Sequence, residues 1–176
     1  MEGAAEAQQS LKDNLLERER KFLTFSLGGE EYGIEILQIK EIIGMMPITS
    51  VPRTPQFFKG VINLRGKVIP VVDLRLRFGM EEKEDTPQTC IVVVEVNKEG
   101  CTETIGVVVD AVSEVVNIKP EETEDPPTFG NMVDTEFISA MAKTDGGVKI
   151  LLDIHKVLGI DDGDGTGMHV ETCEPG

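Results

Sequence analysis

Few side chains of this sequence have the types and spacing that enzymatic chemistry requires. The two histidines are His155, in a short amphipathic segment, and His169, near the C-terminal end. Neither lies in a motif that pairs a histidine with a nucleophilic serine or cysteine, so a hydrolase triad lacks its base. His155 occupies the position that Arg75 fills in an internal repeat, and we expect it on the surface. The sequence therefore predicts no catalytic residue.

Metal and phosphate sites are also poorly supported. The acidic run that starts at Asp162 has the first features of a calcium-binding loop, but its twelfth position is Cys173 rather than the required glutamate. The segment 60–67 has five residues between its glycines rather than four, and Val68 stands where a phosphate-binding loop has serine or threonine. We expect no metal ion and no cofactor.

Asp73 and Asp153 are the carboxylates with the clearest positions, since each precedes a short segment with helical spacing. Two interpretations stay open. Each aspartate is the N-cap of a short helix, or it is the acid or base of an enzyme or small-molecule binder. Their matching positions in two copies of a repeat favour caps, because a catalytic pair would break that symmetry.

One motif has the features of a binding site. Asn63-Leu64-Arg65-Gly66 predicts a tight turn, in which Gly66 supplies the positive φ angle. Residues 21–80 carry a net charge of +3, whereas residues 81–176 carry −16. The corresponding turn of the second repeat, 145–147, has no arginine. Arg65 is therefore a candidate contact for an acidic protein partner.

The composition is that of an acidic protein with one domain or two small intertwined ones. Its 176 residues are 40% hydrophobic and carry a net charge of −15. Such a charge argues against nucleic acid and anionic membranes as partners. The three scattered cysteines predict no disulfide framework. Short apolar runs and the lack of a signal peptide predict a cytoplasmic protein that does not insert into a membrane.

The hydrophobic pattern predicts a repeated β-structure. Apolar residues that alternate or run together predict strands over 21–27, 32–36, 60–64, 67–72, 91–96 and 105–109, with an edge strand or a bulge at Pro70. The residues 32–36 match 105–109, and 68–79 match 148–159. Two copies of a mostly β unit suggest two small β-barrels that share one core, with short helices after the paired aspartates.

The repeat also sets the expected boundaries. Residues 1–20 form an extension, disordered at first and then helical from Ser10 with a stripe of Leu11, Leu15 and Leu16. Residues 21–160 form the folded domain, with repeat units at about 21–79 and 90–159. Residues 161–176 are rich in glycine and aspartate and are expected to be a flexible acidic tail.

Three stretches of the sequence resemble the CheW family of bacterial chemotaxis. They are FLTFSLGGEEYGIEILQIKEI, FFKGVINLRGKVIPVVDLRLRFG and IGVVVDAVSEVV, and the similarity runs from about Lys21 to Gly159. The resemblance implies a mainly β fold of two SH3-like five-stranded barrels that share a hydrophobic core. It also implies a non-catalytic adaptor that couples the cytoplasmic tips of methyl-accepting chemoreceptors to the regulatory domain of the histidine kinase CheA, in membrane-associated receptor arrays.

The resemblance also carries family contacts onto positions of this chain. Receptor contacts fall on Ile39, Glu41 and Arg65, although core packing is an equal alternative for Ile39. Kinase contacts fall on Ile48 and Val51. A contact between barrels in the array falls on Phe129, with Glu124 nearby.

Overall fold

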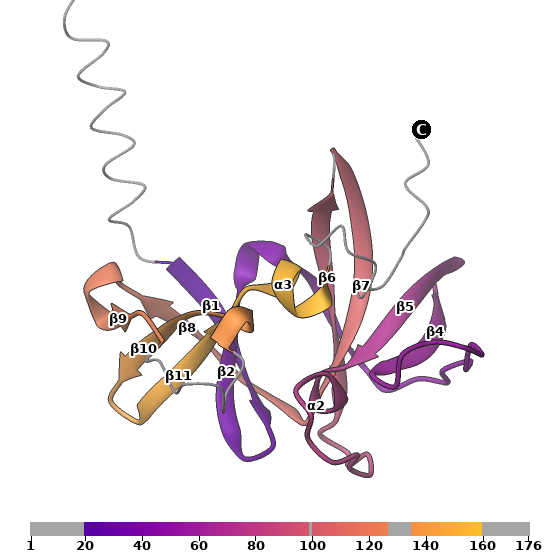
Figure 1. Ribbon diagram of the computed structural model, residues 1–176, viewed down its shortest axis with the longest axis horizontal. Helices are drawn as coiled ribbons and strands as arrows, with labels where there is room; N and C mark the ends of the chain where they lie inside the picture. Colours follow the sequence, from indigo (N-terminus) through magenta and orange to yellow (C-terminus); the bar gives the residue numbers. More distant parts are fainter. Residues whose placement is uncertain (1–19, 99, 127–134, 160–176) are drawn as a thin grey trace, which may run out of the picture.

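Two β-sheets dominate the computed structural model, which describes residues 20–98, 100–126 and 135–159 (Figure 1). The first sheet contains, in spatial order, β8 (Ala111–Ile118), β1 (Arg20–Leu27), β2 (Glu30–Glu35), β11 (Gly147–Leu152), β10 (Ile138–Thr144) and β9 (Thr123–Glu124). The second contains β3 (Ile39–Gly44), β6 (Cys90–Lys98), β7 (Cys101–Val109), β5 (Lys67–Asp73) and β4 (Phe58–Leu64). The mainly β prediction is confirmed, and the two-residue β9 gives the first sheet a sixth strand.

Helices are few and short. Among the residues that the structure describes there are two α-helices, α2 (Leu74–Arg77) and α3 (Ile154–Leu158), and each follows the last strand of a hairpin. Three single turns of 3-10 helix complete the described elements: η1 (Ile36–Gln38), η2 (Pro120–Glu122) and η3 (Thr135–Phe137). No helix of the described residues is long and apolar enough to cross a bilayer.

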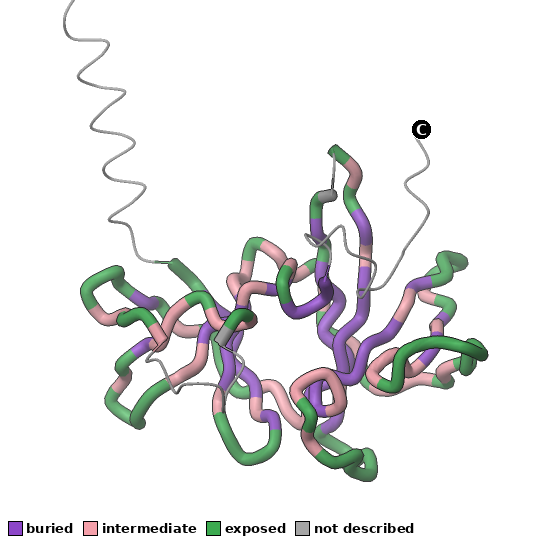
Figure 2. Tube along the Cα trace, in the orientation of Figure 1, coloured by how far each residue is buried: buried purple, intermediate pink, exposed green. Residues whose placement is uncertain are grey.

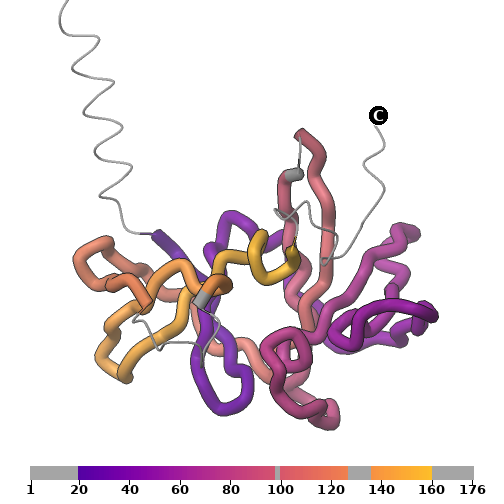
Figure 3. Tube along the Cα trace, viewed as in Figure 1, coloured from indigo at the N-terminus to yellow at the C-terminus, as the bar shows by residue number. Residues whose placement is uncertain are grey.

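The two sheets exchange strands between the repeat units. The first sheet joins β1 and β2 to β8–β11, and the second joins β3–β5 to β6 and β7. In Figure 3 the N-terminal indigo segments therefore lie beside the C-terminal orange and yellow ones. Two short parallel pairings make this exchange, one between β2 and β11 and the other between β5 and β7.

Equivalent glycines lie at these two parallel pairings. Gly33 pairs with Leu151, and Gly106 pairs with Val71. A Cβ atom would lie 2.9 Å from Leu151 Cδ2 at the first glycine and 2.8 Å from Ile91 Cγ2 at the second. A side chain at either position would therefore have to displace a methyl group of the core behind the strand.

The largest hydrophobic cluster lies between the sheets. It contains buried residues of both repeats, among them Phe25 and Ile34 from the first sheet and Val94 and Val107 from the second. Figure 2 shows buried segments where the sheets face each other and exposed loops at the periphery. Smaller clusters lie within the second sheet, around Ile62, and within the first, around Phe22.

Asp73 and Asp153 are N-caps, as predicted. Asp73 accepts a hydrogen bond from the backbone N–H of Arg75, and Asp153 accepts bonds from those of His155 and Lys156. The environment of their helices differs between repeats, because Arg75 is 2% exposed whereas His155 is partly exposed. The inference that Arg75 marks a surface position is therefore wrong.

Two further expectations need correction. Pro70 lies in β5, which is an internal strand rather than an edge. The proline is tolerated because β5 pairs with β7 only from Val71 onward. The backbone N–H that Pro70 lacks is therefore not needed for a hydrogen bond to β7. Among the described cysteines Cys90 is a free thiol, whereas Cys101 is disulfide-bonded, a bond that the expectation of no disulfide framework did not include. The expected N-terminal helix from Ser10 and the tail 161–176 lie outside the described residues.

Candidate interaction site

Arg65 and Glu41 form an ion pair at the tip of the β4–β5 hairpin. Arg65 Nη1 donates to Glu41 Oε1 at 2.9 Å and to Oε2 at 2.7 Å. The hydrogen bond and the negative charge of Glu41 raise the pKa of the Arg65 guanidinium above its ordinary value. The arginine side chain is 71% exposed and that of Glu41 is 22% exposed, so Arg65 is the more accessible member of the pair.

The turn itself holds Arg65 in place. Arg65 and Gly66 have φ angles of 52° and 83°, the pattern of a two-residue turn whose twist suits a hairpin. The Asn63 side chain accepts a hydrogen bond of 2.9 Å from the Gly66 backbone N–H and closes the turn. The predicted motif thus has a structural reason for each of its polar members.

Ile39 and Glu41 lie on β3, at one edge of the second sheet. Ile39 is partly buried and packs against the cluster between the sheets, whereas Ile43 packs against the cluster within the second sheet. The register of the pairing between β3 and β6 shifts between Ile39 and Glu41. Before this shift β3 packs against the cluster between the sheets, and after it β3 packs against the cluster within the second sheet. Ile39 therefore contributes to packing and keeps part of its surface exposed.

An apolar residue beside these positions was not predicted from the sequence. Leu37 lies in η1, two residues before Ile39, and is 86% exposed. Ile42 on β3 is 44% exposed. Isolated exposed apolar residues are common, but two of them flank the same predicted contacts. Sequence periodicity gives no signal for Leu37, because a single 3-10 turn has too few residues to show one.

The loop that precedes β4 carries the predicted kinase contacts. Thr49 forms an isolated bridge with Val61, through two backbone hydrogen bonds of 2.9 Å. Ile48 packs against the cluster within the second sheet, whereas Val51 is 38% exposed. The structure thus gives Ile48 a packing role and leaves Val51 accessible.

The predicted contacts of the array lie elsewhere. Phe129 lies outside the described residues. Glu124 lies on β9 and accepts a hydrogen bond of 2.6 Å from Lys143 Nζ on β10. This ion pair is exposed, because the two side chains keep 65% and 56% of their surface accessible. It joins neighbouring strands of the first sheet.

A buried ionic cluster was not foreseen. Arg75 Nε and Nη2 each lie 3.2 Å from a carboxylate oxygen of Asp73, and its Nη1 lies 3.4 Å from Asp110 Oδ1. Asp110 in turn accepts a bond of 3.0 Å from the Gly28 backbone N–H, in the turn between β1 and β2. The cluster ties α2 to both sheets. Because Asp73 is engaged as a cap and as the partner of Arg75, it is not an available acid or base.

Arg77 joins the two repeats directly. Its guanidinium lies between the rings of Phe57 and Phe137, at 4.7 and 4.6 Å from their centroids. Its Nε donates to the backbone oxygen of Val157 at 2.6 Å. Val157 is the residue that matches Arg77 in the second copy, and Phe57 and Phe137 also match each other. Arg77 therefore binds its own counterpart in the second copy.

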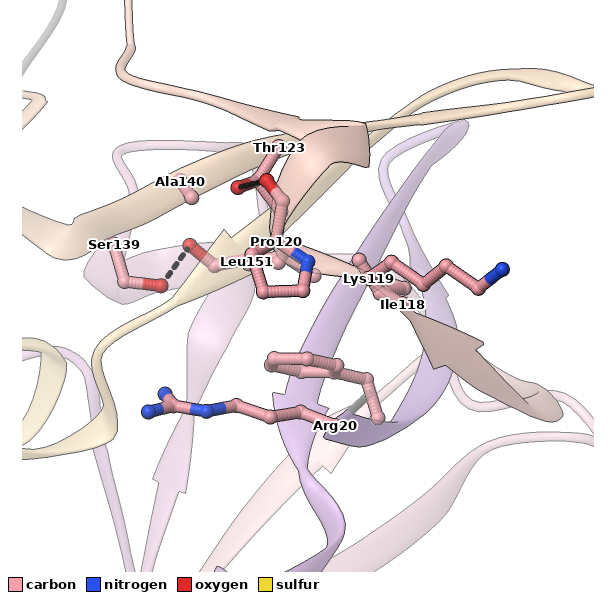
Figure 4. Close-up of a pocket in the computed structure, with 9 residues that line it drawn as sticks. Arg20, Ile118, Lys119, Pro120, Thr123, Ser139, Ala140 and Leu151 are labelled. Carbon is pink, nitrogen blue, oxygen red and sulfur yellow. Dashed lines mark hydrogen bonds between the residues drawn. The ribbon is translucent and has the colours of Figure 1, made fainter. Parts of the chain in front are cut away.

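The described residues offer no site for catalysis by a metal. They contain no group of three or more potential metal ligands. Two open cavities, of about 270 and 250 Å³, lie on the first sheet. The larger has no carboxylate in its lining (Figure 4). The smaller is lined by Glu35 and Asp153, and Asp153 is the N-cap of α3. The arrangement can bind a partner through an ion pair and apolar side chains.

This chain belongs to the CheW-like domain family, whose model matches residues 21–161. The family is one of non-catalytic scaffold and adaptor proteins of chemotaxis. The chemotaxis protein CheW of Klebsiella aerogenes is 37% identical over 139 residues, covering 79% of this chain and 81% of that protein. The CheW of Bacillus subtilis is 33% identical over 139 residues, covering 78% and 86%. The crystal structure of the scaffolding protein TtCheW from Thermoanaerobacter tengcongensis superposes with a TM-score of 0.73 at 37% identity, covering 86% of this chain and 93% of that one.

Family membership supports a role as a chemotaxis adaptor. It also agrees with the prediction that the chain is not an enzyme. The paired aspartates, which left an enzymatic alternative open, are both helix caps in the structure.

Proposed function

We propose that this protein couples the cytoplasmic tips of methyl-accepting chemoreceptors to the histidine kinase CheA, as a cytoplasmic scaffold recruited to membrane-associated arrays. The proposal needs no chemical step, only simultaneous contact with two partners. Each contact is expected to be modest, and repetition of the contacts in an array supplies the strength.

The observation that carries the proposal is the exposed Arg65 held by Glu41. Among the described residues, Arg65 Nε and Nη2 have no hydrogen-bond partner, because both bonds to Glu41 come from Nη1. These two donors are free to grip a carboxylate on a receptor helix. Ile39 and the exposed Leu37 add apolar surface for the stripe of such a helix.

The kinase contact is proposed on the loop that precedes β4. Val51 is the accessible member, and Ile48 shapes the loop from beneath by packing on the core. Contacts with neighbouring barrels in the array are proposed at Phe129 and near Glu124. The Glu124–Lys143 pair is exposed, so a charged side chain of a partner can replace either member of this ion pair.

A co-sedimentation assay tests the function. Receptor-bearing membranes are sedimented with this protein alone, with CheA alone, and with both. We expect the protein to sediment with the membranes and CheA to sediment much more in its presence. Membranes without receptors are the control. Failure of the protein to increase the amount of CheA on receptor membranes would contradict the proposal.

A further inference from the structure

The two cavities of the first sheet form one groove. The larger, of about 270 Å³, runs past Ile118 and Leu151, and the smaller, of about 250 Å³, reaches Gln38. Three residues line both: Arg20, Phe22 and Ser139. The cavities therefore adjoin at the start of β1.

The larger cavity is an apolar hollow with a cationic rim. Figure 4 shows Pro120 between Ala140 on one side and Ile118 on the other, with the Arg20 side chain extended beneath them. Arg20 and Lys119 are its charged residues, and its lining contains no carboxylate. Such a site suits an apolar side chain carried on an acidic segment.

This chain contains such a segment immediately before Arg20 in the sequence. Leu11, Leu15 and Leu16 have the spacing of one helical face. Residues 1–19 carry five acidic and two basic side chains, so their charge is opposite to that of the rim. Leu16 precedes Arg20 by four residues, which span about 14 Å at most. Because Arg20 itself lines both cavities, the leucines start within reach of the groove and at a high effective concentration.

We propose that the segment 11–16 docks its leucine face into this groove of its own chain. The docked segment covers the apolar wall around Leu151 and Ala140. Since the smaller cavity reaches Gln38, which directly precedes Ile39, the segment then borders the surface that carries Ile39, Glu41 and Arg65. This inference does not depend on the proposed function.

Hydrogen–deuterium exchange of the full chain tests the docking. We expect the amides of residues 11–19 to exchange at least tenfold more slowly than their intrinsic rates. Leu15→Asn with Leu16→Asn should abolish this protection, because two apolar contacts are lost. Gln8→Asn with Gln9→Asn is the matched control, which changes two neighbouring polar residues and should retain protection.

A groove variant separates docking from helix formation alone. Ser139→Arg places a large side chain at the point that both cavities share, on an exposed position of β10. It should abolish protection of residues 11–19 while the amides of β1 and β11 stay protected. Intrinsic exchange rates in the unmodified chain, or protection that survives Ser139→Arg, would overturn the proposal. Protection that rises with protein concentration would assign the groove to a second copy instead.

Discussion

Arg65 is accessible and yet already paired, and this combination suits the contact proposed for it. The ion pair with Glu41 fixes the direction of the guanidinium. Less side-chain conformational entropy is then lost when a partner binds. The pair is largely solvated, so its own contribution to stability is small. The side chain is therefore suited to recognition rather than to holding the fold together.

Reversal of Arg65 is expected to weaken receptor binding selectively. Arg65→Glu removes a charge-assisted hydrogen bond to the receptor and adds a like-charge contact. The expected loss of binding free energy lies between that for an ion pair at the rim of an interface and that for a buried ion pair. We expect a loss of about 2 kcal/mol, or roughly thirtyfold in affinity for a receptor fragment. Binding to the CheA regulatory domain should change little. Paired titrations against both partners measure the two effects.

Two further variants serve as controls for the effect of Arg65→Glu on receptor affinity. The double variant Arg65→Glu with Glu41→Arg restores the internal ion pair but moves the positive charge to β3. Receptor affinity should stay low, because the charge is then in the wrong place; its full recovery would mean that only the pair matters. Lys67→Glu reverses a charge on the same hairpin and should leave receptor affinity within about threefold of the unmodified protein, a difference of ~0.6 kcal/mol.

The two helix caps are expected to respond differently to neutralisation. Asparagine caps helices about as well as aspartate, so Asp153→Asn should change the free energy of unfolding by about 0.5 kcal/mol or less. Asp73→Asn removes the negative charge beside the buried Arg75 and should cost about 3 kcal/mol. Urea denaturation of the two variants measures both values. Equal costs would show that Asp73 acts only as a cap.

At the scale of elements, the β4–β5 hairpin and the loop before it form one unit. The bridge between Thr49 and Val61 fixes the loop against β4, and the register of β4 shifts between Phe58 and Gly60. Gly60, with φ of 146°, lies where the loop crosses the strand. The hairpin that presents Arg65 and the loop that presents Val51 are thus coupled through backbone contacts.

Gly60→Ala tests this coupling. A Cβ at this position would lie 2.1 Å from the Thr49 backbone oxygen and 2.9 Å from Ile48 Cγ2, so the loop must move. Gly79→Ala is the control, because Gly79 also has positive φ but has open space around it. We expect Gly60→Ala to cost about 2 kcal/mol more than the control, since overpacking adds to the strain of positive φ. Similar midpoints in urea for the two variants would contradict the close contact.

At the scale of the molecule, the exchange of strands makes the repeats interdependent. The first repeat supplies β1 and β2 to one sheet and β3–β5 to the other, and β3 pairs only with β6 among the described strands. The cluster between the sheets draws on both repeats, and Arg77 binds its own counterpart across them. Neither repeat has a complete sheet by itself.

Fragment complementation tests this interdependence. Division of the chain between Asp85 and Thr86 separates the two repeat units in their linker. We expect fragments 1–85 and 86–176 to be unfolded alone, because each leaves unpaired strand edges and half of the shared core. Their mixture should recover the β-sheet signal in far-UV circular dichroism. A cooperative thermal transition in either isolated fragment would contradict the prediction.

The sequence by itself determined the features that depend on neighbouring residues. Alternation and continuous apolar runs located six of the eleven described strands. Arg65-Gly66 located the hairpin turn, and the two aspartates located the starts of α2 and α3. The internal repeat also indicated two similar units with one core. These signals are local, because a strand, a turn or a cap is specified within about ten residues.

Only the tertiary structure decided which distant groups meet. The buried Arg75 guanidinium meets Asp73 beside it and Asp110 from 35 residues further along the chain. Arg77 is held by Phe57, Phe137 and a backbone carbonyl 80 residues away. Glu41 reaches Arg65 across 24 residues, and Pro70 lies in an internal strand whose second partner begins one residue later. The residues next to a charged side chain in the sequence do not indicate whether it is buried. The free-energy cost of burying the charge depends on counter-charges, and folding alone brings these into contact with it.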